Sequence, residues 1–228
     1  MLIGILETGH APEELHAESG TYAEMFVRLL APHGFEFCSW AVVDMEFPGS
    51  VHDADAWLIT GSRHGAYDDL PFIAPLEGFI RTAHREAVPQ VGICFGHQIM
   101  AQALGGTVEK FQGGWAVGPQ QYDFGDRTMT LNAWHQDQVI RAPEGAEVIA
   151  TNAFCPLAGL RYGNRAWSVQ PHPEFDDRFI EGLIETRGRG RVPDAQLDEA
   201  RARLGGGTDS AQLADCIADF LRQARKAA

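Results

Sequence analysis

A cysteine at a tight corner is the first residue of this 228-residue chain whose surroundings could support chemistry. Cys94 lies in the segment VGICFGHQIMAQALGG (residues 91–106), with Gly92 and Gly96 two positions to either side. This spacing matches the Gly-x-nucleophile-x-Gly pattern, in which a sharp turn from a strand into a helix exposes the nucleophile. The helix N-terminus would favour the reactive thiolate, and the backbone N–H of Phe95 would face an oxyanion. A buried cysteine that only fills space is the alternative, and the pattern alone does not decide.

A histidine and a carboxylate, two positions apart between prolines, form the second candidate. The segment QPHPE (residues 170–174) carries His172 and Glu174 and follows a short strand-like run at residues 166–169. A thiol nucleophile needs a base that takes its proton and later protonates the leaving amine, and a third group that orients this base. Prolines restrict the backbone and so can hold the imidazole and its carboxylate in line. A surface loop that happens to contain a histidine is the alternative.

The third candidate is the turn-rich loop at residues 60–69, which follows an apolar run at residues 56–59. Ligands bind to open parallel sheets at the carboxyl ends of the strands, where this loop, the cysteine corner and the His-x-Glu pair would meet. The Gly61-Ser62 turn could provide the second backbone N–H of an oxyanion hole. An ordinary loop between a strand and a helix is the alternative.

The elements that must position these residues alternate between strands and helices. Apolar runs predict strands at residues 2–6, 35–43, 56–59 and 88–93, and helical spacing predicts helices at residues 22–30 and 75–86. This order predicts an α/β fold with one doubly wound, mostly parallel sheet flanked by helices.

The chain changes character after Gly106. Short strand-like runs broken by glycines occupy residues 107–131, more strands are predicted at 147–151, 159–162 and 166–169, and helices at 175–185 and 209–224. We expect the middle strands to extend the same sheet as an antiparallel part. We therefore divide the chain into a catalytic domain (residues 1–186) and a helical C-terminal extension (residues 187–228) packed on that domain.

Composition excludes several classes of function. Thirty-one acidic residues against 18 basic ones give a net charge of −13, which argues against binding to nucleic acid or to an anionic membrane. No apolar run approaches the roughly 18 residues that span a bilayer, and the N-terminus is not typical of a signal peptide. The four cysteines are scattered without metal-site spacing, so we expect reduced thiols, a cytoplasmic location, and no metal or cofactor.

The two motifs together resemble those of the class I glutamine amidotransferase family. The similarity rests on Gly-Ile-Cys-Phe-Gly-His-Gln around Cys94 and on Gln-Pro-His-Pro-Glu at residues 170–174, and it extends over residues 2–179. It implies a flavodoxin-like fold and hydrolysis of a γ-glutamyl amide through a thioester, which releases glutamate and ammonia. The roles that it implies are nucleophile for Cys94, general base and acid for His172, orienting carboxylate for Glu174, oxyanion hole for the N–H groups of Phe95 and Gly61-Ser62, and glutamine recognition for Gln98, Trp115, His135 and Gln136.

Gly61-Ser62 together with Phe-Gly-His-Gln resembles a stand-alone branch of the family that includes γ-glutamyl peptidases and guanylate synthase-like proteins. Two positions depart from the pattern of many family members. Gly61-Ser62 stands where many members carry paired glycines, and Pro171 replaces the aromatic residue that usually precedes His-Pro-Glu. The chain contains no Gly-x-x-x-x-Gly-Lys-Ser/Thr element for ATP, and the roughly 50 residues after Glu174 are too few for a synthetase domain.

Three functions stay open on the sequence. The chain could be a glutaminase that supplies ammonia to a separate synthetase chain, a peptidase that acts on γ-glutamyl peptides, or a non-catalytic scaffold. The intact Cys-His-Glu set argues against a non-catalytic scaffold. Between the two substrates, we predict free glutamine ahead of γ-glutamyl peptides. Arg63 and His64 could hold the carboxylate of a peptide leaving group, or could lie in a solvated turn.

Overall fold

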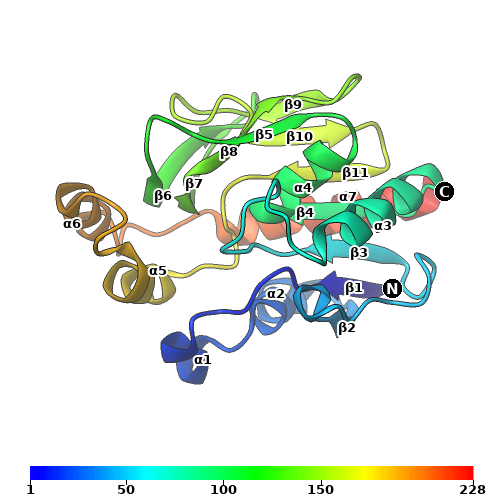
Figure 1. Ribbon diagram of the computed structural model, residues 1–228, viewed down its shortest axis with the longest axis horizontal. Coiled ribbons are helices and arrows are strands. Elements are labelled where there is room, and N and C mark those ends of the chain that lie inside the picture. The colour runs from blue at the N-terminus through cyan, green and yellow to red at the C-terminus, as the bar shows by residue number, and fades with distance from the viewer. Residues whose placement is uncertain (228) are drawn as a thin grey trace.

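A seven-stranded sheet forms the centre of the molecule (Figure 1). The computed structural model describes residues 1–227, with side chains described through Ala224. The strands lie in the order β2 (Glu36–Trp40), β1 (Leu2–Leu6), β3 (Ala56–Ile59), β4 (Gln90–Ile93), β11 (Ala166–Val169), β10 (Gly159–Tyr162) and β9 (Glu147–Ala150). The first five are parallel, and β10 and β9 continue the sheet in antiparallel pairing. The predicted mostly parallel sheet with an antiparallel part is confirmed.

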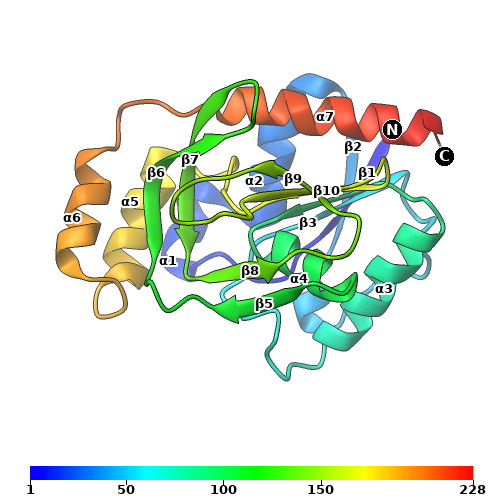
Figure 2. The same ribbon diagram turned by 90° about the horizontal axis from the view of Figure 1, so that it is seen from above.

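Helices cover both faces of this sheet, as Figure 2 shows. On one face, α2 (Tyr22–Leu30) and α7 (Ser210–Ala227) pack against a core that includes Ile5, Phe26 and Ile93. On the other face, α3 (Ile73–Arg85) and α4 (Phe95–Ala103) pack against a core that includes Trp57 and Ile99. The strands β3, β4 and β11 are buried along their whole length because they lie between these two layers.

Local sequence signals account for where two of the helices begin. Thr21 and Glu24 form a capping box at the start of α2, in which the Thr21 hydroxyl accepts the Glu24 N–H at 3.1 Å and the Glu24 carboxylate accepts the Thr21 N–H at 2.9 Å. The predicted helix at 175–185 begins at α5 (Asp177–Leu183), because Asp176 caps it by accepting the Phe179 N–H at 2.8 Å.

The middle of the chain differs from the prediction that all its strands extend the same sheet. Strands β5 (Thr107–Lys110) and β8 (Asp137–Arg141) form one two-stranded sheet, and β6 (Ala116–Asp123) and β7 (Thr128–His135) form another. The β6–β7 hairpin meets neighbouring segments through two single bridges, Asp123 with Thr151 and Asn132 with His172. Pro119 lies inside β6 and lacks an N–H, so it suits an edge strand and not the interior of a larger sheet.

A third cluster of apolar side chains lies beyond the carboxyl ends of the parallel strands. It includes Tyr22, Phe175 and Phe179 and joins α1 (Glu13–Ser19), α5, the π-helical turn Ile184–Gly188 and α6 (Asp194–Ala202) at one end of the molecule (Figure 1). The division of the chain at residue 186 falls inside the π-helical turn and stays a prediction. No helix in residues 1–227 is both long enough and apolar enough to cross a membrane.

Candidate active site

Cys94 stands at a strained turn between β4 and α4. Its backbone has φ 54° and ψ −104°, a conformation that side-chain-bearing residues rarely adopt and that is typical of a nucleophile elbow. The turn is held on both sides, because the Cys94 N–H donates to the Val169 carbonyl at 2.9 Å and the Gly96 N–H donates to the Thr60 carbonyl at 3.1 Å. The thiol is thus fixed at the carboxyl ends of the three central strands, beside the positive end of α4.

Gly92 and Gly96 must be glycines because neighbouring atoms lie too close to their Cα atoms to admit a side chain. A Cβ on Gly92 would lie 2.5 Å from the Gly96 carbonyl oxygen and from the Met100 sulfur. A Cβ on Gly96 would lie 2.2 Å from the carbonyl oxygen of Ile59, at the end of β3. Real Cβ atoms do not approach other atoms so closely, so any side chain at either position would push α4 away from the sheet. The Gly-x-Cys-x-Gly spacing therefore has a packing reason in addition to its chemical one.

His172 and Glu174 form a buried ion-paired unit next to the thiol. Nδ1 of His172 lies 2.7 Å from Oε1 of Glu174, and the two side chains are 4% and 0% exposed. The imidazole stacks on the Phe175 ring with centroids 4.0 Å apart and an angle of 8° between the planes. The backbone N–H of His172 donates to the Asn132 carbonyl at 2.8 Å. Because Nδ1 faces Glu174, Nε2 is the nitrogen left to interact with Cys94.

The electrostatics of the site favour a protonated imidazole. Burial on its own lowers the pKa of His172, but the charge of Cys94, the charge of Glu174 and hydrogen bonds to both raise it to about 10. A buried charge of this kind is stable only when it is paired, and here it is paired on both nitrogens. The arrangement suits a thiolate–imidazolium pair, the reactive state of cysteine nucleophiles.

The Gly61-Ser62 turn lies against the Cys-His pair. A Cβ on Gly61 would lie 2.9 Å from Cε1 of His172 and 3.8 Å from the Cβ of Cys94. The Gly61 carbonyl accepts hydrogen bonds from the Thr8 and Thr60 hydroxyls at 3.0 and 3.1 Å, which fixes the turn. No described residue accepts the N–H of Gly61 or of Phe95, so both donors are free beside the thiol. The predicted positions of the oxyanion hole are therefore brought together.

We predict that Gly61→Ala lowers kcat by about 10- to 100-fold, because small displacements of a catalytic group have effects of this size. The added methyl would press on the His172 ring, which Phe175 stops from moving away. The Gly61 backbone is not in the left-handed region, so the fold should tolerate alanine and the midpoint of urea unfolding should change little. Gly78→Ala is the control, since nothing lies within 4 Å of a Cβ there. An unchanged kcat for Gly61→Ala would contradict this placement of the turn.

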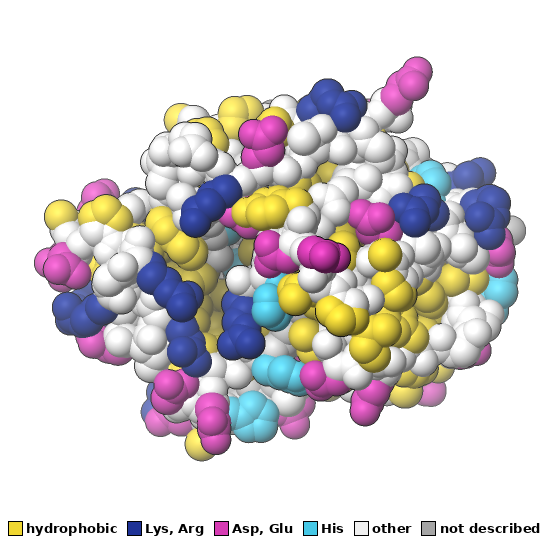
Figure 3. Space-filling view, viewed as in Figure 1, with side chains coloured by type: hydrophobic (Ala, Val, Ile, Leu, Met, Phe, Trp, Pro, Cys, Tyr) yellow, Lys and Arg dark blue, Asp and Glu magenta, His cyan; other side chains and the backbone are white. Residues whose placement is uncertain are grey.

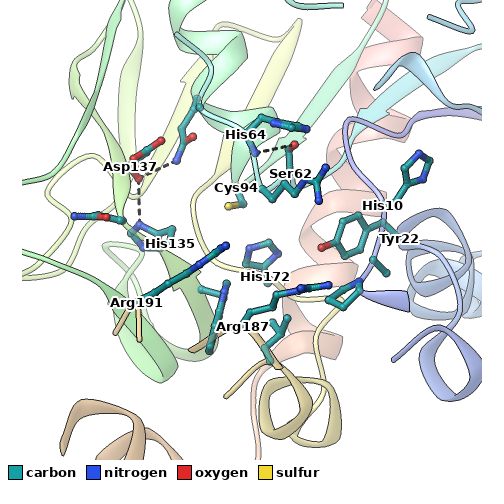
Figure 4. A pocket seen from close by; sticks show the side chains of 18 of the residues that line it. His10, Tyr22, Ser62, His64, Cys94, His135, Asp137, His172, Arg187 and Arg191 are labelled. Atoms are coloured by element: carbon teal, nitrogen blue, oxygen red, sulfur yellow. Dashed lines mark hydrogen bonds between the residues drawn. The ribbon is translucent and has the colours of Figure 1, made fainter. Parts of the chain in front are cut away.

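A cavity of about 800 Å³ opens in front of the thiol. Lys and Arg side chains gather around this hollow in Figure 3, although the whole chain carries a net charge of −13. Among the described residues, its charged lining consists of Arg63, Lys110, Arg187 and Arg191 with the carboxylates Glu13, Asp68 and Asp137. In Figure 4, His135 and Tyr22 lie on opposite sides of Cys94 and His172. The cavity thus has two ends, with the reactive pair between them.

The end near His135 holds the residues predicted to recognise glutamine. Gln98, Trp115, His135 and Gln136 all line the cavity. Burial lowers the pKa of His135 to about 3, so its imidazole is neutral. Its Nδ1 lies 3.2 Å from the Asp137 carbonyl oxygen and must donate to it, which leaves the buried, unpartnered Nε2 as an acceptor. The Gln98 side-chain amide donates to the same carbonyl at 2.8 Å and thereby fixes this end.

The end near Tyr22 contains residues that the sequence analysis missed. Tyr22 and Arg187 line the cavity with Arg63 and His64, which had been predicted as partners for a carboxylate. Burial and the charge of Arg63 lower the pKa of His64, so Arg63 is the better anion partner of the two. Tyr22 opens an ordinary amphipathic helix, and nothing in its spacing marked it. The alternating Arg-Gly run at residues 187–191 is visible in the sequence, but nothing in its spacing indicates a contact with the cavity.

The chain belongs to the class I glutamine amidotransferase family, whose model matches residues 22–179. It is 29% identical over 243 residues to a glutamine amidotransferase-like protein of Schizosaccharomyces pombe, covering 96% of this chain and 98% of that protein. It is 30% identical over 183 residues to γ-glutamyl peptidase 4 of Arabidopsis thaliana, covering 73% and 72%. It is also 30% identical over 220 residues to a glutamine-hydrolysing GMP synthase of Methylobacillus flagellatus, covering 80% of this chain and 40% of the synthase.

Solved structures agree on the fold. The crystal structure of a glutamine amidotransferase from Methylobacillus flagellatus has a TM-score of 0.76 at 19% identity and covers 97% of this chain and 94% of its own. A glutamine amidotransferase from Thermotoga maritima has a TM-score of 0.74 at 20% identity and covers 98% of both chains. At these identities the likeness concerns the arrangement of the sheet and helices.

Proposed function

We propose that the chain hydrolyses a γ-glutamyl amide through a thioester on Cys94. The observation that carries this proposal is the unit formed by His172 and Glu174 beside a strained, helix-capping cysteine. The buried carboxylate 2.7 Å from Nδ1 fixes the imidazole, and Nε2 is then directed to the thiol. A cysteine that only filled space would need neither the ion pair nor the two free N–H donors beside it.

The proposed reaction proceeds in two stages. The Cys94 thiolate attacks the γ-carbonyl carbon, and the N–H groups of Gly61 and Phe95 donate to the oxyanion that forms. His172 gives its Nε2 proton to the amide nitrogen, and the C–N bond breaks. The amine departs, and the γ-glutamyl group remains on Cys94 as a thioester. Water then attacks the thioester, His172 takes its proton, and the C–S bond breaks to release glutamate and restore the thiolate. Glu174 holds the imidazole throughout and stabilises its positive charge.

Recognition of the glutamyl group is assigned to the end of the cavity near His135. The neutral Nε2 of His135 is a buried acceptor without a partner, which suits the α-ammonium group of the substrate. Gln98, Trp115 and Gln136 line the same cavity and would enclose the methylene groups and the α-carboxylate. These roles follow the resemblance to the family, and the position of the side chains supports them.

Free glutamine and γ-glutamyl peptides are the two candidate substrates. With glutamine, the product ammonia would pass to a separate synthetase chain, as the similarity to GMP synthases suggests. The cavity of about 800 Å³, which continues past His172 to Tyr22, favours the peptides because ammonia needs no such space. The similarity to γ-glutamyl peptidases supports the same candidate. The four free cysteines fit the proposed reducing, cytoplasmic location.

The test is kcat/KM for glutamine and for a panel of γ-glutamyl dipeptides, measured as glutamate release by the purified chain. We expect turnover of at least one of the two classes without any added metal or nucleotide. Preference for dipeptides would identify a peptidase, and preference for glutamine a glutaminase. Absence of glutamate from every substrate would overturn the proposed function.

A further inference from the structure

Two arginines and a tyrosine define the end of the cavity away from His135. Arg63 and Arg187 both line the cavity with Tyr22. Burial and the charges of Glu174 and Cys94 raise the pKa of Tyr22, and the charges of Arg187 and Arg63 act on it in the opposite direction. The Tyr22 hydroxyl points into the cavity towards His172 (Figure 4). Arg63 and Arg187 come from segments more than 100 residues apart, the loop after β3 and the π-helical turn after α5. The fold therefore brings two positive charges to the cavity that Tyr22 also lines.

Neither arginine is neutralised inside the cavity. Arg63 forms no ion pair with any described residue. Arg187 pairs with Glu14 at 3.2 Å, but the two side chains are 39% and 57% exposed, so this ion pair is weak. A bound carboxylate can therefore replace Glu14 as the partner of Arg187. Guanidinium groups bind carboxylates in a fixed, two-pronged geometry, and a tyrosine hydroxyl can add a third donor. This end of the cavity has the chemistry of a site for a carboxylate.

The geometry of the reaction shows which carboxylate this is. The tetrahedral carbon on Cys94 carries the oxyanion, the glutamyl chain and the leaving nitrogen, which must point in three directions. The oxyanion is directed to Gly61 and Phe95, and the glutamyl chain to the His135 end. The leaving nitrogen must then lie towards His172, which protonates it, and its substituent extends to Tyr22 on the far side (Figure 4).

We propose that Arg63, Arg187 and Tyr22 bind the carboxylate of the leaving group, so that the preferred substrates are γ-glutamyl amides of amino acids. This inference rests on the proposed function and specifies its substrate class. The α-carboxylate of an amino acid is two bonds from the amide nitrogen, so it lies beside that nitrogen when His172 delivers its proton. Arg187 lies beyond residue 179, where the family match ends, whereas Tyr22 and Arg63 lie within it, so part of this specificity is carried by a segment outside the matched region.

The test compares γ-glutamylglycine with γ-glutamylmethylamide, which differ only by the leaving-group carboxylate. We expect the wild-type chain to prefer γ-glutamylglycine in kcat/KM by about 10-fold or more, the size of one charge-assisted hydrogen bond. Arg63→Gln and Arg187→Gln should each reduce this preference by about 10-fold. Arg189→Gln is the matched control, since Arg189 belongs to the same Arg-Gly run but does not line the cavity, and should keep the wild-type ratio.

The ratio separates specificity from damage to the fold, because a misfolded variant loses activity on both substrates and keeps its ratio. A wild-type ratio near one, with both substrates hydrolysed, would overturn this inference and leave the proposed function standing. A high ratio unaffected by either arginine variant would overturn the assignment of the carboxylate site. Failure of the wild type to hydrolyse either substrate or glutamine would overturn both proposals.

Discussion

Cys94→Ala is expected to abolish covalent labelling by a diazo-ketone analogue of glutamine and to lower kcat/KM for γ-glutamyl amides by about 10³-fold or more. Cys94 is the one thiol of the four placed at an elbow with free N–H donors beside it. Burial raises the pKa of Cys155 to about 12 and that of Cys216 above its ordinary value, so neither forms a thiolate readily. Mass spectrometry of the labelled protein identifies the modified residue.

Cys38→Ala is the matched control for this labelling. Cys38 is exposed, so it would react first if accessibility alone decided. The control variant should be labelled and should turn over substrate like the wild type. Labelling at Cys38, or equal labelling of all four cysteines, would contradict the role of Cys94 as the nucleophile.

The second large effect is expected at the base and its carboxylate. His172→Ala should remove almost all turnover, whereas Glu174→Gln should lower kcat by about 100-fold or more and leave measurable activity. Glutamine keeps an acceptor for Nδ1 but loses the negative charge that stabilises the imidazolium. It also places an amide NH2 group in a buried site, because the second carboxylate oxygen of Glu174, Oε2, is buried and has no hydrogen-bond partner. Glu109→Gln, on the exposed face of β5, is the control and should leave kcat unchanged.

Glu174→Gln should also lower the pKa of His172 from its value of about 10, because the charge of Glu174 and its hydrogen bond both raise that pKa. The folded pKa lies above the unfolded value of about 6.5, so protonated His172 stabilises the fold. This contribution is complete below about pH 6.5 and is lost as pH rises to about 10. NMR titration of the imidazole measures the pKa of His172, and urea unfolding across this pH range measures the free energy of unfolding. An unchanged His172 pKa in the variant would contradict the proposed pairing.

The sheet and the reactive unit could be predicted because their signals are local. Gly92 and Gly96 mark the elbow since any side chain there would collide with β3 or α4, and prolines mark the His-x-Glu segment. The β6–β7 hairpin differs from the prediction because strand periodicity does not say which sheet a strand joins, and Pro119 is the one local sign that β6 is an edge strand.

The end of the cavity near Tyr22 could not be predicted in the same way. Tyr22 and Arg187 come together only through the packing of α2 against Phe175 and Phe179, which join α5 to the base segment. No residue spacing within either segment predicts that Tyr22 and Arg187 line the same cavity. Arg63 was identified because it lies in the loop after β3, at an edge of the sheet that the fold class already specified.

The bridge between Asn132 and His172 joins the β6–β7 hairpin to the proposed catalytic base. Cys94 is held by the central sheet, whereas the His172 segment follows β11 of that sheet and is also joined to β7 through its backbone. The Asn132 side chain reinforces this attachment by donating to the Phe175 carbonyl at 2.9 Å. A displacement of the hairpin would therefore act directly on the imidazole and its stacked ring, whereas the Cys94 turn forms no backbone hydrogen bond to the hairpin among the described residues. The position of the imidazole relative to the thiol thus depends on the hairpin as well as on the central sheet.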